Sequence, residues 1–131
     1  MDSAPVSVLV VDDQEPFRRA ARVVLGHTDG FELVGEAQSG EEAVTMADAL
    51  QPDLVLMDIN MAGINGVEAT RRIVEANPGI TVVLVSTYAV GDLPADAASS
   101  GAKAYVNKEE LTPAVLRRVW EQRPEGGWEV G

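Results

Sequence analysis

Short apolar runs and amphipathic segments alternate along the chain. Residues 6–11, 54–57 and 80–85 are almost continuously apolar and rich in valine, leucine and isoleucine. Runs of this length and composition predict strands buried on both faces, which is typical of a parallel sheet. Two weaker runs, residues 32–37 and 104–107, predict two further strands.

Between these runs, apolar residues recur every three or four positions, as on one face of a helix. This periodicity predicts helices over residues 17–25, 40–50, 65–76 and 113–122. Ser39 and Glu42 have the spacing of a capping box at the start of the second helix. Residues 90–100 predict one more helix, a poor one, because Gly91 and Pro94 weaken it and its apolar face is mostly alanine.

Strands and helices therefore alternate five times, with short connections between them. This order predicts an α/β fold: a five-stranded parallel sheet with helices on both faces, the (βα)5 flavodoxin-like doubly wound sandwich. In open sheets of this kind, ligands bind beyond the carboxyl ends of the strands. The residues that follow the predicted strands are therefore the candidate site residues.

The length of 131 residues fits one core, and we expect one domain over residues 1–123, followed by a tail or the start of a linker at 124–131. Twenty-one acidic against ten basic residues give a net charge of −11, which disfavours direct binding to nucleic acid or anionic membranes. The absence of cysteine excludes thiolate catalysis and cysteine-ligated metals. No run is as long as a membrane span and residues 1–5 are no signal peptide, so we expect a cytoplasmic protein.

Carboxylates follow two of the strong strands: Asp12 and Asp13 the first, and Asp58 the run at 54–57. Parallel strands bring their carboxyl ends to one edge of the sheet, so these side chains should meet there. Three carboxylates within roughly 5 Å of one another repel by about 3 kcal/mol per pair at an effective dielectric constant of 20. A hard divalent cation removes that conflict, and an all-oxygen site suits Mg²⁺.

Ser86 and Lys108 follow the last two strands and suit the oxygens of a phosphoryl group, as a hydrogen-bond donor and a point charge. A carboxylate can accept such a group, and Asp58 is the best candidate because it ends the central strand before a tight loop. Taken singly, each residue has an ordinary alternative. Asp12 or Asp13 could cap a helix, Asp58 and Ser86 could be turn or loop residues, and Lys108 could belong to a solvated charge run.

Four stretches carry a resemblance to a known family. They are Val-Leu-Val-Val-Asp-Asp at 8–13, Asp-Leu-Val-Leu-Met-Asp-Ile-Asn-Met at 53–61, Val-Ser-Thr-Tyr at 85–88 and Gly-Ala-Lys-Ala-Tyr-Val-Asn-Lys at 101–108. Together they resemble the CheY-like receiver domain of two-component response regulators, over residues 7–121. Residues 35–37 and 65–69 are most similar to the NarL/FixJ-type subgroup, whose members usually carry a C-terminal helix-turn-helix.

The resemblance implies a role for each site residue. Asp58 would be the phosphoacceptor, and Mg²⁺ (or Mn²⁺) would be held by Asp58, Asp13, Asp12 through water, and the backbone carbonyl of Asn60. The phosphoryl-binding and switch residues would be Ser86, Thr87, Tyr105 and Lys108. Asn60 and Tyr88, two residues beyond Asp58 and Ser86, would tune the rate of dephosphorylation.

Two positions depart from the family pattern. Ala62 and Glu109 stand where the family usually has proline, after the methionine of the loop and after the lysine. The first change loosens the loop that would carry the metal-binding carbonyl. The second argues against a cis peptide bond, which costs about 3 kcal/mol without proline. Neither change removes a reacting group, so activity is expected.

The resemblance implies a phosphorylation switch rather than an enzyme with a separate substrate. Its partners would be a sensor histidine kinase and, on phosphorylation, a second copy of the chain; DNA would be reached only through a C-terminal effector domain. The alternatives are a degenerate receiver that acts by binding alone, an aspartate-nucleophile phosphatase or an FMN carrier. The phosphatase would need an acid at Asn60, and Asp12 and Asp13 would repel the FMN phosphate. Arg18, Arg19 and Arg22 form either a kinase-docking patch or a solvated helix face.

Overall fold

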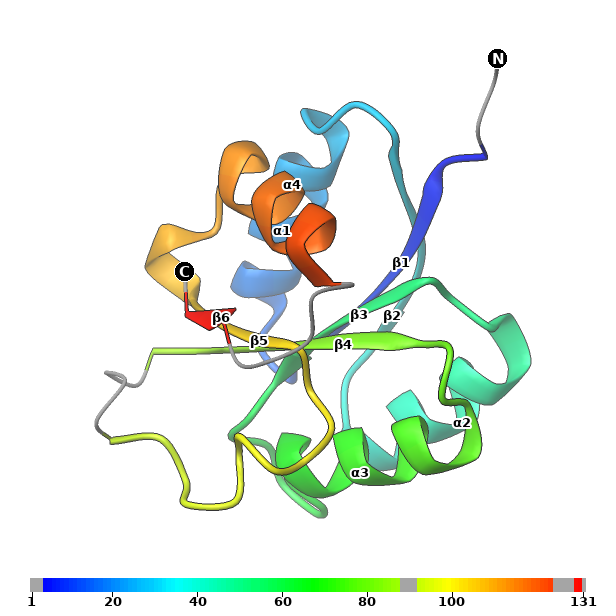
Figure 1. Ribbon diagram of the computed structural model, residues 1–131, viewed down its shortest axis with the longest axis vertical. Coiled ribbons are helices and arrows are strands. Elements are labelled where there is room, and N and C mark those ends of the chain that lie inside the picture. Colours follow the sequence, from blue (N-terminus) through cyan, green and yellow to red (C-terminus); the bar gives the residue numbers. More distant parts are fainter. Residues whose placement is uncertain (1–3, 88–91, 124–128, 131) are drawn as a thin grey trace.

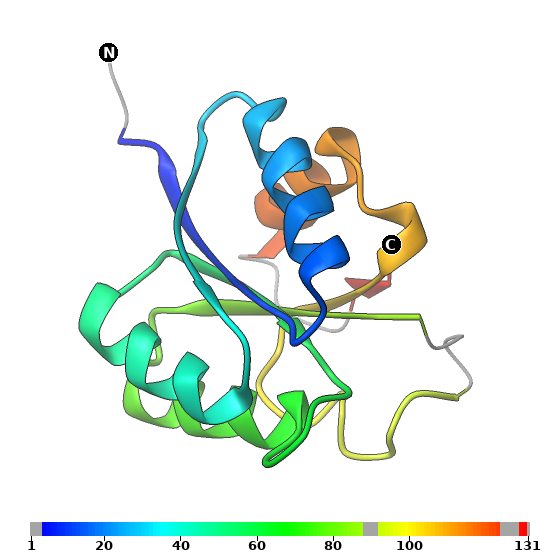
Figure 2. The ribbon, with the colours of Figure 1, turned by 180° about the vertical axis from the view of Figure 1, so that it is seen from behind.

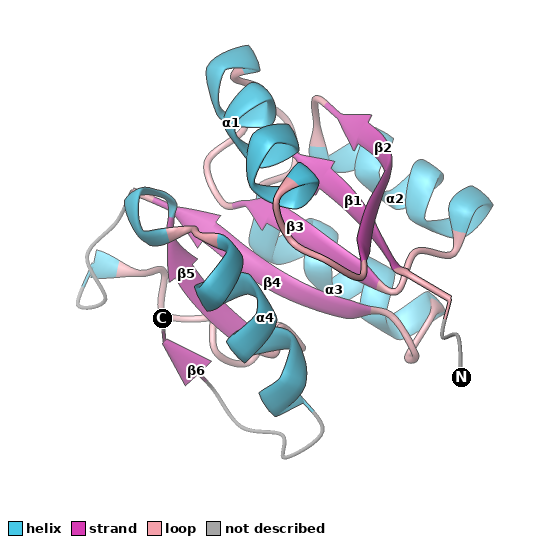
Figure 3. Ribbon diagram, turned by 90° about the horizontal axis from the view of Figure 1, so that it is seen from above, coloured by secondary structure: helices cyan, strands magenta, loops and turns pink. Residues whose placement is uncertain are grey.

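A parallel sheet forms the centre of the chain, with the strand order β2-β1-β3-β4-β5-β6 (Figures 1 and 3). The computed structural model describes residues 4–87, 92–123 and 129–130. The strands are β1 (Val6–Val11), β2 (Phe31–Ala37), β3 (Leu54–Asp58), β4 (Thr81–Ser86), β5 (Ala104–Asn107) and β6 (Glu129–Val130). All five predicted strands form, and the predicted α/β fold is confirmed.

Helices cover both faces of the sheet. The helix α1 (Glu15–Gly26) and the helix α4 (Pro113–Gln122) lie on one face, whereas α2 (Gly40–Leu50) and α3 (Gly66–Ala76) lie on the other (Figures 1 and 2). Each face has its own buried core, because the side chains of a strand alternate between the two sides. In the described part of the chain, no helix is both long and apolar enough to cross a membrane.

Local hydrogen bonds fix the starts of α2 and α3. Ser39 Oγ accepts a hydrogen bond from the Glu42 amide at 3.0 Å, and the Glu42 carboxylate accepts one from the Gln38 amide at 2.7 Å. The Asn65 side chain likewise accepts from the Glu68 amide at 2.9 Å at the start of α3. The predicted helix start at Ser39 is confirmed, and Asn65 caps α3 in the same way, because both side chains satisfy amides that the first turn leaves free.

The helix predicted over residues 90–100 is wrong for the part that the structure describes. Residues 92–100 form successive turns, in which the Ala97 amide bonds to the Pro94 carbonyl and the Ser100 amide to the Ala97 carbonyl. Proline and paired serines favour turns, and an alanine-rich face buries too little apolar surface to overcome them. Only Ala97 and Ser100 of this stretch are buried.

The short strand β6 was not predicted, since residues 124–131 read as a tail or linker. Glu129 and Val130 pair in parallel with Ala104 and Tyr105 of β5. Two residues cannot display a strand periodicity, and the pairing uses only the main-chain groups that the edge of β5 offers. The described residues contain no cis peptide bond.

Candidate functional site

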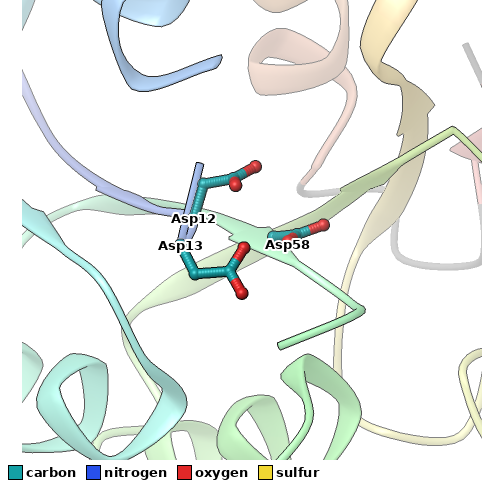
Figure 4. A group of neighbouring side chains, drawn as sticks. All are labelled: Asp12, Asp13 and Asp58. Atoms are coloured by element: carbon teal, nitrogen blue, oxygen red, sulfur yellow. The ribbon is translucent and has the colours of Figure 1, made fainter. Parts of the chain in front are cut away.

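The order of the strands brings Asp12, Asp13 and Asp58 together. In the sheet, β2 lies on one side of β1 and β3 on the other. The parallel strands β1 and β3 are therefore neighbours at the point where the strand order reverses. Asp12 and Asp13 follow β1, and Asp58 is the last residue of β3. Figure 4 shows the three side chains at these neighbouring strand ends. This point of reversal is where open α/β sheets bind their ligands.

The three carboxylates form a tight acidic cluster. Each contributes an oxygen, and these oxygens lie within 4.8 Å of one another. Asp12 is fully buried and Asp58 is 3% exposed, whereas Asp13 lies at the surface. The Lys108 ammonium lies 2.6 Å from Asp12 Oδ2 and 3.3 Å from Asp58 Oδ1. One ammonium and three carboxylates leave the cluster with a net charge of −2.

This charge imbalance perturbs Asp58. Burial, and then the negative charge of Asp12, raise the pKa of Asp58 from 3.8 to about 6, against the opposing effect of Lys108. Burial lowers the pKa of Lys108, but its contacts with Asp12 and Asp58 outweigh burial and raise the pKa above its ordinary value. Lys108 therefore stays protonated, while the Asp58 carboxylate is poorly stabilised by the protein alone.

The donor set fits a hard divalent cation. It consists of carboxylate oxygens, the ligands that Mg²⁺ and Mn²⁺ prefer, and it contains no sulfur or imidazole. A charge of +2 would balance the cluster and remove the repulsion that raises the pKa of Asp58. The exposed Asp13 also leaves one side of the cluster open to ligands from solvent.

The ordinary alternatives for Asp12, Asp13 and Lys108 do not describe this structure. Gln14 is the N-cap of α1 and makes no side-chain capping bond, so neither Asp12 nor Asp13 caps that helix. Asp12 Oδ1 instead accepts a hydrogen bond from the Gln14 amide at 2.8 Å, which leaves Oδ2 to face Lys108. Lys108 is not a solvated charge, because its side chain is only 17% exposed.

The predicted switch residues lie on the two neighbouring strands. Ser86 ends β4 and is buried, and Thr87 follows it at the surface. Tyr105 lies in β5, is 1% exposed, and donates a hydrogen bond from its hydroxyl to the Ser86 backbone carbonyl at 3.0 Å. Tyr105 is thus a core residue that also contacts Ser86 directly.

The structure describes one of the two residues predicted to tune dephosphorylation. Asn60 lies in the loop after β3 and is exposed, two residues beyond Asp58. Tyr88 lies outside the described residues. Asn60 is therefore close in sequence to the cluster and open to solvent.

Arg18 has a structural contact that the sequence did not indicate. Its guanidinium donates to the Asp12 backbone carbonyl at 2.8 Å and pairs with Glu36 at 3.3 Å, and its side chain is 11% exposed. Arg22 pairs with Glu15 and Glu36, so of the three arginines Arg19 is the most exposed. Arg19 also lies 4.0 Å from Glu15, so all three arginines have an acidic partner, which weakens the case for a free docking patch.

Phe17 also lies at the site, although its spacing indicated only a core position. Its ring lies 4.8 Å from the Lys108 ammonium, which it contacts as a cation–π partner. The sequence shows only that an aromatic residue stands four positions after Asp13, and no sequence pattern connects it with Lys108. Phe17 thus supports the lysine that neutralises part of the cluster.

The raised pKa of Asp58 predicts a pH dependence of stability in metal-free buffer. The protonated carboxyl is favoured in the folded state, so its stabilising effect is complete below pH 3.8 and is lost as pH rises through about 6. A shift of this size corresponds to about 3 kcal/mol of unfolding free energy. The Asp58→Asn chain should therefore be more stable than the unaltered chain at pH 7.5, and the difference should shrink toward pH 5.

The measurement is the difference in unfolding free energy between these two chains across that pH range. Taking the difference cancels the pH dependence that comes from acids with a lowered pKa, such as Glu15 and Glu68, because both chains carry them. A difference that stays constant with pH would mean that Asp58 is not the group with the raised pKa. Added Mg²⁺ should reduce the difference at pH 7.5.

Comparisons with known proteins agree with this arrangement. The family model for the response regulator receiver domain matches residues 8–119. Response regulator GacA of Pseudomonas viridiflava is 42% identical over 103 residues, which cover 79% of this chain and 48% of that protein. The chain thus spans about half the length of the curated relatives it matches.

Solved structures have the same fold. The signal receiver domain of the putative response regulator NarL from Mycobacterium tuberculosis has a TM-score of 0.81 at 27% identity, covering 93% of this chain and 98% of that one. The CheX-CheY-BeF3-Mg+2 complex from Borrelia burgdorferi has a TM-score of 0.78 at 30% identity, covering 89% and 88%. With the acidic cluster at the strand ends, these matches show that the chain belongs to the response regulator receiver domain family of two-component signalling proteins.

Proposed function

We propose that Asp58 accepts a phosphoryl group from a phosphohistidine of a sensor histidine kinase. The observation that carries the proposal is the buried Asp58 carboxylate beside Asp12, Asp13 and Lys108. A carboxylate oxygen of Asp58 would attack phosphorus, forming an acyl phosphate. The phosphorus–nitrogen bond would break, and the released imidazole would take up a proton.

The cation site would consist of Asp12, Asp13, Asp58 and the backbone carbonyl of Asn60. Bound Mg²⁺, or Mn²⁺, would offset the negative charge of the phosphoryl oxygens during transfer. Asp12 is held by the Gln14 amide and Arg18 holds its backbone carbonyl, so the protein orients this carboxylate before any ligand binds. The similar structure from Borrelia burgdorferi is a complex with BeF3 and Mg+2, which supports this choice of ion.

Lys108, Ser86 and Thr87 would contact the phosphoryl oxygens. The Lys108 ammonium already lies 3.3 Å from Asp58 and would exchange part of this contact for the new oxygens. The Ser86 hydroxyl would donate a hydrogen bond to the same group. A movement of Ser86 would displace Tyr105, whose hydroxyl donates a hydrogen bond to the Ser86 carbonyl. Phosphorylation of Asp58 would in this way shift β5 and the surface beside it.

The acyl phosphate would be hydrolysed at the same site, at a rate tuned by Asn60 and Tyr88. The chain would not turn over a separate substrate; its chemistry would be limited to its own phosphorylation and dephosphorylation. We place this exchange in the cytoplasm. Phosphorylation would favour a homodimer or the binding of another partner. The match covers about half the length of the curated relatives, which leaves room for an effector domain through which DNA would be reached.

Intact mass spectrometry after incubation with acetyl phosphate tests the proposal. The unaltered chain should gain one phosphoryl group in the presence of Mg²⁺, and none when the cation is removed with a chelator. A chain that stays unmodified under both conditions would support the second candidate, a receiver that acts by binding alone. Continued release of phosphate from an added phosphomonoester would instead indicate a phosphatase.

A further inference from the structure

A side chain of α2 holds the loop between β3 and α3, residues 59–65. The Glu41 carboxylate, in the first turn of α2, accepts a hydrogen bond from the Ile64 backbone amide at 3.1 Å. This bond is the main reason why the pKa of Glu41 lies below its ordinary value. The two residues are 23 positions apart, so the loop is tied to a different helix from the one that follows it.

The loop approaches α2 more closely than a side chain would allow. Gly63 has a φ of +81°, and a Cβ there would lie 2.7 and 2.8 Å from the two Glu41 carboxylate oxygens. A Cβ on Gly40 would lie 2.8 Å from the Ile64 backbone oxygen. Glycine at both positions therefore lets the first turn of α2 and the loop pack against each other directly.

Asn60 lies between two attachments of this loop. The Gly66 amide donates to the Ile59 carbonyl at 2.9 Å at the strand end, and Glu41 holds Ile64 on the far side. Ala62, between these attachments, leaves a φ angle free that a proline would restrict. The position of the Asn60 backbone carbonyl therefore depends on both attachments.

We infer that Glu41 is a positioning residue for the cation site, holding residues 59–65 so that the Asn60 carbonyl faces the acidic cluster. This inference rests on the proposed function, because it assumes that Asp12, Asp13, Asp58 and the Asn60 carbonyl bind Mg²⁺. Glu41 is not itself a ligand, since its carboxylate is engaged by Ile64. Without Glu41 the loop would adopt other conformations as well. Mg²⁺ would then bind only the fraction of molecules in which the Asn60 carbonyl faces the acidic cluster, so the apparent affinity would fall.

Three variants of the full chain separate this role from general stability. E41A removes the acceptor for Ile64, whereas E41Q keeps a carbonyl oxygen that can accept the same bond. E42A is the matched control: Glu42 is the neighbouring acid in the same turn, but its carboxylate bonds to the Gln38 amide, beside the N-cap residue Ser39. For each chain, the Mg²⁺ dissociation constant is measured from backbone amide NMR shifts, and the hydrogen-exchange protection of the Ile64 amide is measured without metal.

E41A should bind Mg²⁺ about five-fold more weakly and lose protection at Ile64, as expected for one solvent-exposed hydrogen bond. E41Q should restore both to near the unaltered values. E42A should lower the unfolding free energy but leave the Mg²⁺ dissociation constant unchanged. Unchanged Mg²⁺ affinity in E41A, beside normal binding by the unaltered chain, would overturn this inference alone. Failure of the unaltered chain to bind Mg²⁺ would overturn the proposed cation site, and this inference with it.

Discussion

Replacing Asp58 with asparagine is expected to abolish the phosphoryl adduct that acetyl phosphate and Mg²⁺ should produce on the unaltered chain. An amide oxygen carries no charge and is a poor nucleophile, so it does not attack phosphorus at a useful rate. The substitution also removes one carboxylate from the acidic cluster, which should weaken Mg²⁺ binding. Asparagine has almost the same shape as aspartate and relieves the repulsion from Asp12, so the fold should persist.

Asp53→Asn is the matched control for this experiment. Asp53 precedes β3, at the amino end of the strand whose carboxyl end carries Asp58, and its carboxylate accepts a hydrogen bond from the Ser7 amide at 2.9 Å. This chain should gain one phosphoryl group like the unaltered protein. Intact mass and circular dichroism of all three chains make the comparison. An adduct of equal amount on D58N would place the acceptor at another residue.

Gly66→Ala is expected to destabilise the fold by about 3 kcal/mol or more. Gly66 opens α3, and a Cβ there would overlap the Asp58 backbone oxygen and lie 2.8 Å from its carbonyl carbon. It would also lie 2.9 Å from the Ile59 Cα. These neighbours are backbone atoms of β3 and the residue after it, so they cannot move without displacing the end of the central strand.

Gly79→Ala makes the same chemical change where there is space. A Cβ on Gly79 would meet no atom within 4 Å, so the unfolding free energy should change by less than about 0.5 kcal/mol. Denaturant unfolding of both chains measures the two values. If Gly66→Ala were as stable as Gly79→Ala, α3 would not pack against Asp58 as the structure has it. If it folds, Gly66→Ala should also reduce the phosphoryl adduct, because it shifts the backbone that carries Asp58.

Much of the fold could be predicted because the signals for it are local. The runs of β1, β3 and β4 are almost continuously apolar, and the capping box of Ser39 and Glu42 marks where α2 begins. The convergence of Asp12 and Asp58 could be predicted as well. It follows from a general property of parallel sheets and needs no knowledge of side-chain packing.

Residues 92–100 could not be predicted correctly from the same signals. Their alanines have the spacing of a helix, but Pro94 and the serines support the turns that the structure contains. The choice depends on how much apolar surface each conformation buries against the rest of the molecule, where only Ala97 and Ser100 are buried. The strand β6 depends in the same way on a partner, since β5 supplies every group with which it pairs.

By itself, the sequence determined the class of fold, the order of the strands along the chain and the types of residue at their carboxyl ends. Only the tertiary structure decided which side chains meet: Lys108 with Asp12, Arg18 with the Asp12 carbonyl, and Glu41 with Ile64. It also decided that Asp58 has a raised pKa, because burial and neighbouring charge arise only when distant segments pack together. Periodicity and caps act within a few residues of the chain, whereas these contacts depend on how helices and strands cross in space.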